Sequence, residues 1–465
     1  MEGTKYTTQE AVLARARQAI GIPLWQIDTT GRLATGKGAI GTVIEESWFG
    51  YPPNPDAEPD LPEAGVELKV TPYIRGKNGI RAKERLVCNI INYMEEHDKT
   101  FFTSSFWHKC NTMLLMSYEH RPDTPKGEFT IDQAVLFRFP EEDLAIIRQD
   151  WETIMAKVRA GRAHELSEGD TLYLAACTKG ATAASVRPQP FSPIPAKQRA
   201  YCLKASYMTQ LLNTYIFGQR QDPRIIRSVQ VLHARTFEDY IAEKVRPFRG
   251  MTQHQLMDRF GVSSRAKSLN EILLARMLGV QGRIAATEEF QKAGILPKTI
   301  RVQRNGRVRE SMSFPTFDFI QLSREKVWEE SALYHYLAPT RFLFVIFQER
   351  EPGQYVFDRI QFWNIPSADL DEVDRVWQRT VQTIRRGVRL FPTPYGVRND
   401  LPKQADSPVA HVRPHGRSAH DTLPLPDGRR MTKQCFWLNN TYITAQIQQS
   451  ADRRSSCPSG EGREG

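Results

Sequence analysis

The chain has 465 residues, 40% of them hydrophobic and 25% charged, which is typical of a soluble globular protein and too long for one ordinary core. Its formal net charge is +10 with a pI of about 9.2, and no apolar run reaches membrane-spanning length. These features exclude a transmembrane protein and favour a nucleic-acid-binding protein over an ordinary basic enzyme. Six scattered cysteines without a Cys-x-x-Cys pair argue against a structural zinc site and predict a reducing, cytoplasmic environment.

Helices and strands alternate along the first third of the chain. Residues 8–21 carry apolar residues at helical spacing, and a second helix opens after Gly36 and Gly38. In residues 66–70, apolar residues alternate with Glu67 and Lys69, as in a strand with one buried face. Further strands are predicted within 81–96 and 101–119, followed by a strand and a helix within 129–161.

The pair Pro59-Asp60 precedes Glu67-Leu68-Lys69 in a spacing that suggests a catalytic site. Side chains two apart on a strand point the same way, and the Pro-rich turn can bring Asp60 to the Glu67 side. Two carboxylates form a hard-oxygen site for Mg²⁺, and a neighbouring lysine can orient a water that attacks phosphorus. The pattern predicts a phosphodiesterase; the alternative is a surface ion pair between Glu67 and Lys69 that contributes little.

The chain contains two related halves. Six residues of the first half recur in the second, each displaced by 226 positions: Asp132, Pro140, Asp143, Leu144, Trp151 and Gly161 correspond to Asp358, Pro366, Asp369, Leu370, Trp377 and Gly387. We therefore predict domains at residues 1–220 and 221–447, with a low-complexity, disordered tail at 448–465.

The halves differ at the strand that carries the motif. Residues 63–69 (EAGVELK) align with residues 292–298 (KAGILPK), so that Leu296 replaces Glu67 and Pro297 replaces Leu68, while Asp60 falls opposite Glu289. Leucine cannot bind Mg²⁺, and proline removes a backbone donor. The second copy is predicted to keep the scaffold and lose the metal, which leaves one active site per chain.

These segments resemble the MutH family of PD-(D/E)xK nucleases. The resemblance rests on GKGAIG…E…WFG, EAGVELKVTP, AHELSEG…CTKGA and HVRPH…MTKQ, and it extends from about residue 8 to residue 447. It is stronger still to the two-domain restriction-endonuclease relatives of MutH, which recognise GATC. The resemblance implies an α/β fold, with a mixed central sheet flanked by helices, present twice in tandem.

The resemblance also implies roles for residues outside the strand. A glutamate on the first helix joins the family site; counting forward from Gly41 gives Glu45 and counting back from Trp48 gives Glu46, because the chain carries one extra residue. Glu45 is preferred, and the choice stays open. Lys109 is placed to stabilise charge on the scissile phosphate, and the Leu68 carbonyl is an additional metal ligand beside Asp60 and Glu67.

The implied DNA contacts lie in several loops. Lys37 and Gly38 sit where family members approach the bases, and Lys179 lies in the recognition loop. The basic stretch 162–204 adds Arg187, Lys197 and Arg199 as phosphate or groove contacts, although a solvated basic surface explains it equally well. Family loops have Arg-Pro before the lysine, whereas this chain has Cys177-Thr178; Arg413-Pro414 in the second copy fits the pattern better.

The predicted function is that of a type II restriction endonuclease, hydrolysing DNA with Mg²⁺ at GATC or a closely related site. The second copy is predicted to act as an allosteric DNA-binding domain. Cutting both strands requires a homodimer on DNA, a pseudo-dimer of the two domains or successive nicks, and such a system includes a cognate DNA methyltransferase. The alternatives are a mismatch-repair-type GATC nickase and a non-enzymatic DNA-binding regulator.

Overall fold

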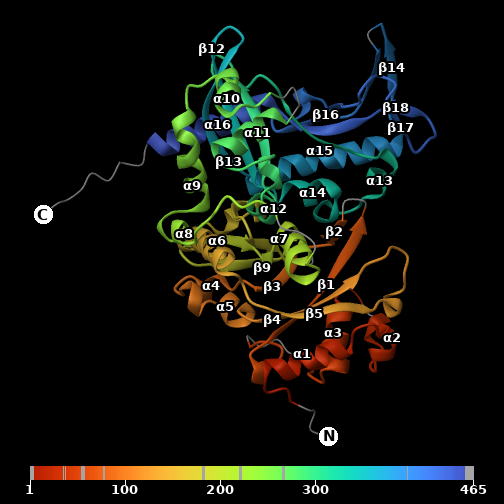
Figure 1. Cartoon of the computed structure of the whole chain (residues 1–465). Coiled ribbons are helices and arrows are strands. Elements are labelled where there is room, and N and C mark those ends of the chain that lie inside the picture. The colour runs from red at the N-terminus through yellow and green to blue at the C-terminus, as the bar shows by residue number, and fades with distance from the viewer. Residues whose placement is uncertain are drawn as a thin grey trace, which may run out of the picture. The chain divides into compact units, whose positions relative to one another are not determined.

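The computed structural model describes residues 5–34, 36, 38–53, 58–76, 79–180, 184–218, 222–263, 268–394 and 396–455. The chain, traced in Figure 1, divides into two compact units. The first comprises Met1–Ile241, Leu278–Leu296 and Pro339–Arg341, and the second comprises Ala242–Met277, Pro297–Ala338 and Phe342–Gly465. The first unit thus continues past the predicted junction at residue 220 and includes a later segment. No helix among the described residues is long and apolar enough to cross a membrane.

A four-stranded mixed sheet carries the predicted motif in the first unit. Its order is β2–β1–β4–β5, formed by Gly79–Ala82, Glu67–Gly76, Met113–Glu119 and Ile131–Phe137. Strand β1 runs parallel to β4, while the β1–β2 and β4–β5 pairs are antiparallel. Residues 113–118 of β4 are all buried, as expected for a strand covered on both faces. The motif strand β1 is therefore an inner strand of this sheet, next to the buried strand β4.

A second sheet and a hairpin complete the strands of the first unit. The sheet has the order β3–β9–β6, formed by Leu86–Ile90, Arg199–Leu203 and Leu174–Thr178, and all its pairs are antiparallel. The hairpin consists of β7 (Val186–Gln189) and β8 (Ser192–Lys197).

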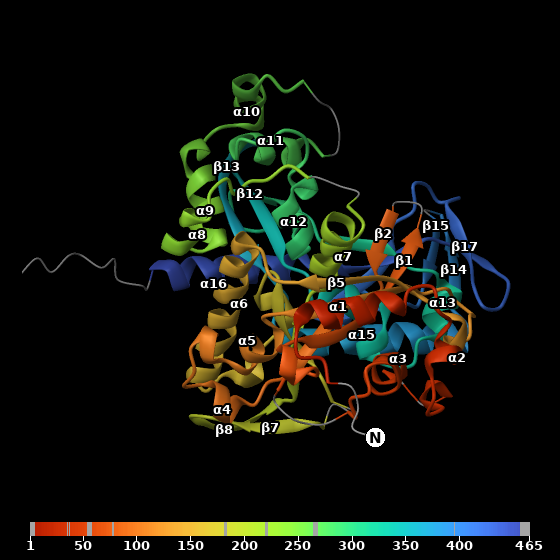
Figure 2. The same cartoon turned by 60° about the horizontal axis from the view of Figure 1, so that its bottom comes forward.

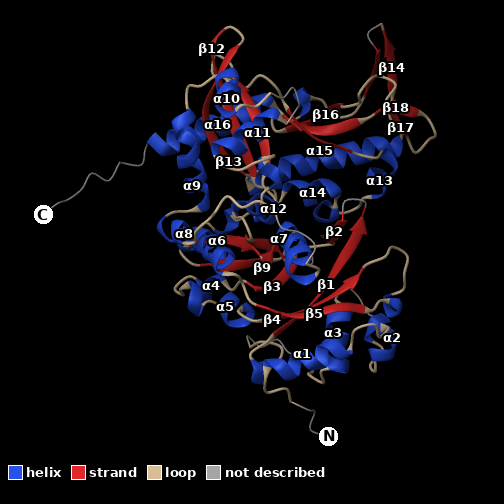
Figure 3. Ribbon diagram, in the orientation of Figure 1, coloured by secondary structure: helices blue, strands red, loops and turns tan. Residues whose placement is uncertain are grey.

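Helices pack around these sheets, as Figures 2 and 3 show. The predicted first helix is α1 (Gln9–Gln18), capped by the Thr8 hydroxyl, and the second is α3 (Ala39–Val43), which continues into the π-helix η2 (Ile44–Trp48). Residues 101–119 contain a helix that the sequence analysis did not predict, α5 (Ser105–Cys110), whose cap is the Ser104 hydroxyl. The other α-helices wholly within this unit are α2 (Leu24–Ile27), α4 (Tyr93–Glu96), α6 (Glu141–Arg159), α7 (Ala205–Leu211), α8 (Gln230–Ala234) and α12 (Glu288–Ala293), and α9 (Phe237–Val245) runs across the unit boundary.

The second unit contains the same kinds of element. One sheet has the order β10–β12–β13 (Leu296–Val302, Phe342–Glu351, Gln354–Trp363), and the other has the order β11–β19–β16 (Met312–Thr316, Gln434–Leu438, Ala410–Pro414). Two hairpins are formed by β14 (Leu390–Thr393) with β15 (Gly396–Asn399) and by β17 (Thr422–Pro424) with β18 (Arg430–Thr432). Its helices are α10 (Gln253–Phe260), α11 (Leu269–Met277), α13 (Phe319–Arg324), α14 (Ala332–Leu337), α15 (Ser367–Arg386) and α16 (Asn440–Ser455). Helix α16 runs through the start of the tail predicted from residue 448, and residues 456–465 lie outside the described residues.

The order of elements confirms the internal duplication. The sheets β1–β4–β5 and β3–β9–β6 recur as β10–β12–β13 and β11–β19–β16, and helix α6 recurs as α15. Even the cap of α5 is repeated, because the Ser331 hydroxyl accepts from the Tyr334 amide at the start of α14. One addition distinguishes the second copy. Hairpin β14–β15 follows α15, whereas only the short turns η6 (Ala163–Glu165) and η7 (Glu168–Asp170) separate α6 from β6.

Candidate active site

A tight turn before β1 brings Asp60 and Glu67 together. Leu61 and Val66 exchange two backbone hydrogen bonds across the 3-10 turn η3 (Pro62–Ala64), which closes at Gly65 with φ of 63°. The Asp60 amide then donates to Glu67 Oε2 at 3.2 Å, and the Leu68 amide donates to Asp60 Oδ2 at 3.2 Å. The two predicted carboxylates therefore lie side by side at the N-terminal end of β1.

Two lysines face these carboxylates. Lys69 Nζ donates to Glu67 Oε1 at 2.6 Å and to the Cys88 carbonyl at 3.3 Å. Lys109, near the end of α5, places its Nζ 3.7 Å from both Asp60 Oδ1 and Glu67 Oε2. The side chains of Lys69 and Lys109 are each 15% exposed and that of Glu67 only 1%, so this is a buried cluster and not the surface ion pair of the alternative interpretation.

Burial and mutual charge set the protonation behaviour of the cluster. Burial raises the pKa of Glu67, an effect that Asp60 reinforces and the two lysines oppose. Burial works against the charged form of Lys69, but Glu67 outweighs it and holds the pKa of the amine above its usual range. Glu67 thus keeps Lys69 protonated, which is the state required to stabilise negative charge on a phosphate.

The structure separates the two candidate glutamates of the first helix. Burial, together with Asp60 and Glu67, raises the pKa of Glu45 to about 7, so Glu45 lies within electrostatic reach of the cluster. Glu46 instead forms an ion pair with Arg32 at 2.5 Å. Both lie in the π-helix η2, and a π-helical turn accommodates one residue more than an α-helical turn. This helix can therefore accommodate the extra residue noted in the sequence, and Glu45 is the glutamate whose pKa the cluster raises.

The donor set fits a hard divalent cation. Asp60 and Glu67 converge within 3.7 Å of one amine, and both are oxygen donors. The N–H and C=O of one strand residue point to the same edge of the strand; since the Leu68 amide bonds Asp60, the Leu68 carbonyl also points to the Asp60 side. Among the described residues, no three Asp, Glu, His or Cys side chains gather at one point. The protein thus offers two carboxylates and a carbonyl, which leaves room for the waters that Mg²⁺ usually keeps.

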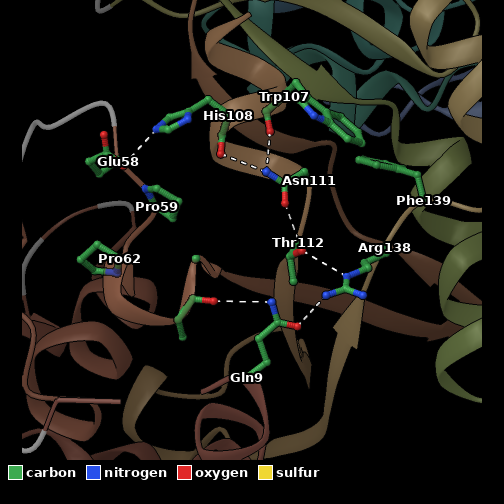
Figure 4. A pocket seen from close by; sticks show the side chains of 12 residues that line it. Gln9, Glu58, Pro59, Pro62, Trp107, His108, Asn111, Thr112, Arg138 and Phe139 are labelled. Atoms are coloured by element: carbon green, nitrogen blue, oxygen red, sulfur yellow. Dashed lines mark hydrogen bonds and ion pairs between the residues drawn. The ribbon is translucent and has the colours of Figure 1, made fainter. Parts of the chain in front are cut away.

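A cavity of about 580 Å³ opens beside the cluster. Pro59 and Pro62, which flank Asp60, line one side, and His108, next to Lys109, lines another (Figure 4). His108 Nε2 lies 3.0 Å from Glu58 Oε2 at the mouth. Arg138 extends along the wall and donates to Gln9 Oε1 at 2.8 Å and to Thr112 Oγ1 at 3.3 Å. The cavity is lined by Gln9, Glu58, Pro59, Pro62, Ala64, Gly65, Trp107, His108, Asn111, Thr112, Arg138 and Phe139.

Most of the predicted DNA-binding residues of the first copy lie at the surface of the protein. Lys37 lies outside the described residues, while Gly38 is exposed in a left-handed conformation at the N-terminus of α3. Lys179 is exposed just after β6, and Arg187 and Lys197 are half-buried on the β7–β8 hairpin. Each of these four described residues lies at the surface.

Arg199 is a correction to the predicted DNA-binding set. It is only 3% exposed, and its guanidinium donates to the Ala176 carbonyl at 2.7 Å and to the Leu166 carbonyl. The residue is basic and lies in a basic stretch of sequence, but β9 is the central strand of its sheet and turns this side chain inward. Arg199 therefore holds the sheet to the preceding turn and does not reach DNA.

Replacing Arg199 with alanine is expected to lower the free energy of unfolding by about 2–3 kcal/mol, because two buried carbonyls lose a charged donor. Replacing Lys179 with alanine is expected to leave stability unchanged and to reduce by about 1 the slope of log binding constant against log salt concentration. Urea unfolding and DNA-binding titrations at several salt concentrations measure the two effects. A changed salt slope in the Arg199 variant, with stability unaltered, would contradict this assignment.

In the second copy, Arg413 is exposed at the end of β16, with its guanidinium 3.9 Å from the centre of the Trp437 ring. The sequence analysis did not identify Trp437 as its partner. Trp437 lies on β19, and only the pairing of this strand with β16 brings the ring to Arg413. Stacking on an aromatic ring restricts an arginine while leaving its donors available.

Three of the four positions equivalent to the Asp60, Glu67, Lys69 and Lys109 cluster carry a different residue in the second copy. Glu289, opposite Asp60, is buried and accepts backbone hydrogen bonds from Ile225 and Ile226 at 2.8–3.1 Å. Leu296 stands where Glu67 stands at the start of the strand, and Tyr336 of α14 replaces Lys109 of α5. Lys298 is retained, and its Nζ donates to the Ser313 carbonyl at 3.5 Å. Burial lowers the pKa of Lys298, because it has no counterpart of Glu67 beside it on the strand.

Comparison with known proteins identifies the family. The family model of the DNA mismatch repair enzyme MutH matches residues 49–150, which include the whole cluster except Glu45. The type II restriction enzyme Sau3AI of Staphylococcus aureus is 38% identical over 485 residues, covering 95% of this chain and 99% of that enzyme. The DNA mismatch repair protein MutH of Shewanella woodyi is 30% identical over 45% of this chain and 93% of its own length, and that of Escherichia coli is 27% identical over 46% and 95%. The chain therefore belongs to the MutH-like site-specific deoxyribonucleases, in the two-domain group that contains the type II restriction enzyme Sau3AI.

Proposed function

We propose that the protein is a Mg²⁺-dependent type II restriction endonuclease that cuts DNA at GATC or a closely related site, and that its second copy is catalytically inactive. The observation that carries the proposal is the clustering of Asp60, Glu67, Lys69 and Lys109 at the start of β1, with Lys69 Nζ 2.6 Å from Glu67 Oε1. Similarity to Sau3AI along almost the whole chain supports a restriction enzyme in particular.

The residues have distinct proposed roles. Asp60, Glu67 and the Leu68 carbonyl would hold the cation, and Glu45 completes the acidic side of the site. A bound Mg²⁺ supplies Lewis-acid stabilisation of charge on phosphate oxygens and lowers the pKa of a water. Lys69 orients the attacking water, and Lys109 stabilises the charge that develops on the scissile phosphate.

The adjoining cavity has the surface expected beside a scissile phosphate. It begins at Pro59 and His108, immediately next to Asp60 and Lys109, and Arg138 adds a positive charge to its wall. Trp107 and Phe139 contribute apolar surface there. We propose that the nucleotide neighbouring the scissile phosphate enters this cavity, with base recognition by Gly38, Lys37 and Lys179 in the major groove, where all four base pairs differ.

The second copy is proposed to bind a second recognition site and to stimulate cleavage by the first. Leu296 stands at the position of Glu67, and Glu289, at the position of Asp60, is hydrogen-bonded to the Ile225 amide. The Arg413-Pro414 pair, which resembles the family pattern, is exposed. Cleavage of both strands then requires two protomers on DNA or a pseudo-dimer of the two copies, with a cognate methyltransferase protecting the host.

Supercoiled plasmids with one and with two GATC sites test this proposal. With the full-length protein and Mg²⁺, we expect linear product with ends that map to GATC, and several-fold faster cutting of the two-site plasmid. Accumulation of nicked circles without linear DNA would indicate a nickase instead. Ends that map elsewhere would refute the proposed target, and equal rates on both plasmids would refute the effector role. Loss of all cleavage in EDTA is the control for the cation.

A further inference from the structure

The β14–β15 hairpin of the second unit has no counterpart in the first copy. It is added between α15 and β16, where the first copy has only short 3-10 turns, so the fold is complete without it. The cross-strand pairs are Leu390 with Asn399, Phe391 with Arg398 and Pro392 with Val397. Every described residue from 390 to 399 is exposed or half-buried.

Both faces of this hairpin present apolar side chains to solvent. Phe391 is 49% exposed and Val397 is 60% exposed, and consecutive cross-strand pairs lie on opposite faces of a ribbon. A hairpin that packs on a core exposes one face, with its apolar side chains on the other. A two-stranded ribbon with apolar side chains on both faces instead has the form of an element that enters a groove of a partner.

The side chains on and beside the hairpin carry positive charge. Arg398 lies opposite Phe391, and Arg389 stands at the base of the hairpin; neither guanidinium has an ion pair or hydrogen bond with another described residue. The neighbouring acids are each occupied by another base: Asp400 by Arg386 at 3.1 Å, Asp421 by Lys433 at 2.7 Å and Asp427 by Arg429 at 2.6 Å. The available charge is therefore positive.

This positive surface continues beyond the hairpin. Arg429 donates to the Val388 carbonyl at 2.6 Å, which ties the β17–β18 turn to the residues just before β14. Strands β14, β15 and β17 are labelled together in Figure 2. The loop that leads into β17 follows the exposed Arg413 at the end of β16. In DNA complexes, an exposed phenyl ring can contact thymine methyl groups, and exposed arginines can bind guanine edges and phosphates.

From these observations we infer that the β14–β15 hairpin enters the major groove of the duplex held by the second copy, with Phe391 toward the base edges and Arg398 and Arg389 on guanine or phosphate. The major groove is about 12 Å wide and admits a two-stranded ribbon. The inference rests on the proposed binding of a second duplex by this copy. It adds a contact element that the first copy does not possess.

Dimethyl sulfate protection of guanine N7 tests the inference, because N7 lies in the major groove. The full-length protein in EDTA is mixed with a GATC duplex flanked by guanines, and the number of duplexes bound per chain is measured by analytical ultracentrifugation. Wild-type protein should protect flanking guanines that become reactive in Phe391→Ser. The second duplex should bind about tenfold more weakly to that variant, with an unchanged salt slope. Arg398→Ala should reduce the salt slope by about 1.

Val327→Ser is the matched control, since Val327 is a 45% exposed apolar residue of the same unit that is not part of the hairpin, and it should leave all of these quantities unchanged. Arg398→Ala, on the same face of the hairpin as Phe391, keeps the inference testable should Phe391→Ser unfold. Binding of only one duplex by the wild-type chain refutes the effector proposal itself. Binding of two duplexes with identical N7 protection in both hairpin variants refutes the hairpin contact alone. A shift in oligomeric state without a change in DNA binding assigns the hairpin to a protein partner and also overturns the inference.

Discussion

Replacing Lys69 with alanine is expected to reduce the rate of DNA cleavage by about 10²–10³-fold, the usual cost of removing one preorganised charge from a catalytic site. The ammonium group is fixed by Glu67 at 2.6 Å and by the Cys88 carbonyl at 3.3 Å, and it is shielded from solvent. Its position is therefore set before substrate arrives. Single-turnover cleavage of a GATC duplex in Mg²⁺ measures the effect, with DNA affinity determined separately in EDTA.

The chain provides its own control for this experiment. Lys298 occupies the equivalent position on β10 in the second copy, but the neighbouring acid is replaced by Leu296. Lys298→Ala should therefore leave the cleavage rate of the single-site duplex unchanged. Equal losses in the two variants would contradict the assignment of one active site per chain, and full activity of Lys69→Ala would remove Lys69 from the mechanism.

Asp143→Ala is expected to destabilise the first unit by about 3–5 kcal/mol, because it leaves a buried ammonium group without its main partner. Lys292 Nζ lies 2.7 and 2.8 Å from the two carboxylate oxygens of Asp143, and the two side chains are only 3% and 5% exposed. The remaining partner, Glu288, is shared with Arg224. Urea unfolding followed by tryptophan fluorescence should show the loss in the transition of this unit.

Glu142→Ala is the matched control for Asp143→Ala. Glu142 is the preceding residue of α6, but its side chain is 42% exposed and its ion pair with Arg224 is long, at 3.5 Å. Its removal should therefore lower the free energy of unfolding by less than about 1 kcal/mol. The double change Asp143→Leu with Lys292→Met should recover most of the lost stability, since replacing a buried pair by apolar groups is often neutral. Equal effects of Asp143→Ala and Glu142→Ala would show that the buried pair contributes little.

This buried pair also affects how the second copy can be tested. A chain ending near residue 220 would lack α12, and with it Lys292, which is the buried partner of Asp143 and whose carbonyl accepts from the Ser206 hydroxyl. Truncation would therefore damage the catalytic unit itself. The role of the second copy is better tested by substitutions in the intact chain.

The motif strand, the duplication and the replacement of Glu67 in the second copy can all be predicted from the amino-acid sequence alone. The alternation around Glu67 and Lys69, and the replacement of Glu67 by Leu296, depend only on backbone periodicity and residue chemistry, which can be read within a few residues. The structure confirmed the duplication, because the two sheets and the long helix recur in the same order in both halves.

The surroundings of Glu45, Glu46, Arg199 and Glu289 could not be predicted from the sequence alone, because they depend on the packing of distant elements. Glu45, in a π-helical turn, lies within electrostatic reach of Asp60 and Glu67, whereas Glu46 pairs with Arg32. The central position of β9 turns Arg199 inward, although the surrounding sequence is basic. The partners of these residues and of Glu289 come from elements distant in the sequence. The burial of each side chain and its hydrogen-bond or ion-pair partners depend on how those elements pack. Local periodicity in the sequence carries no information about that packing.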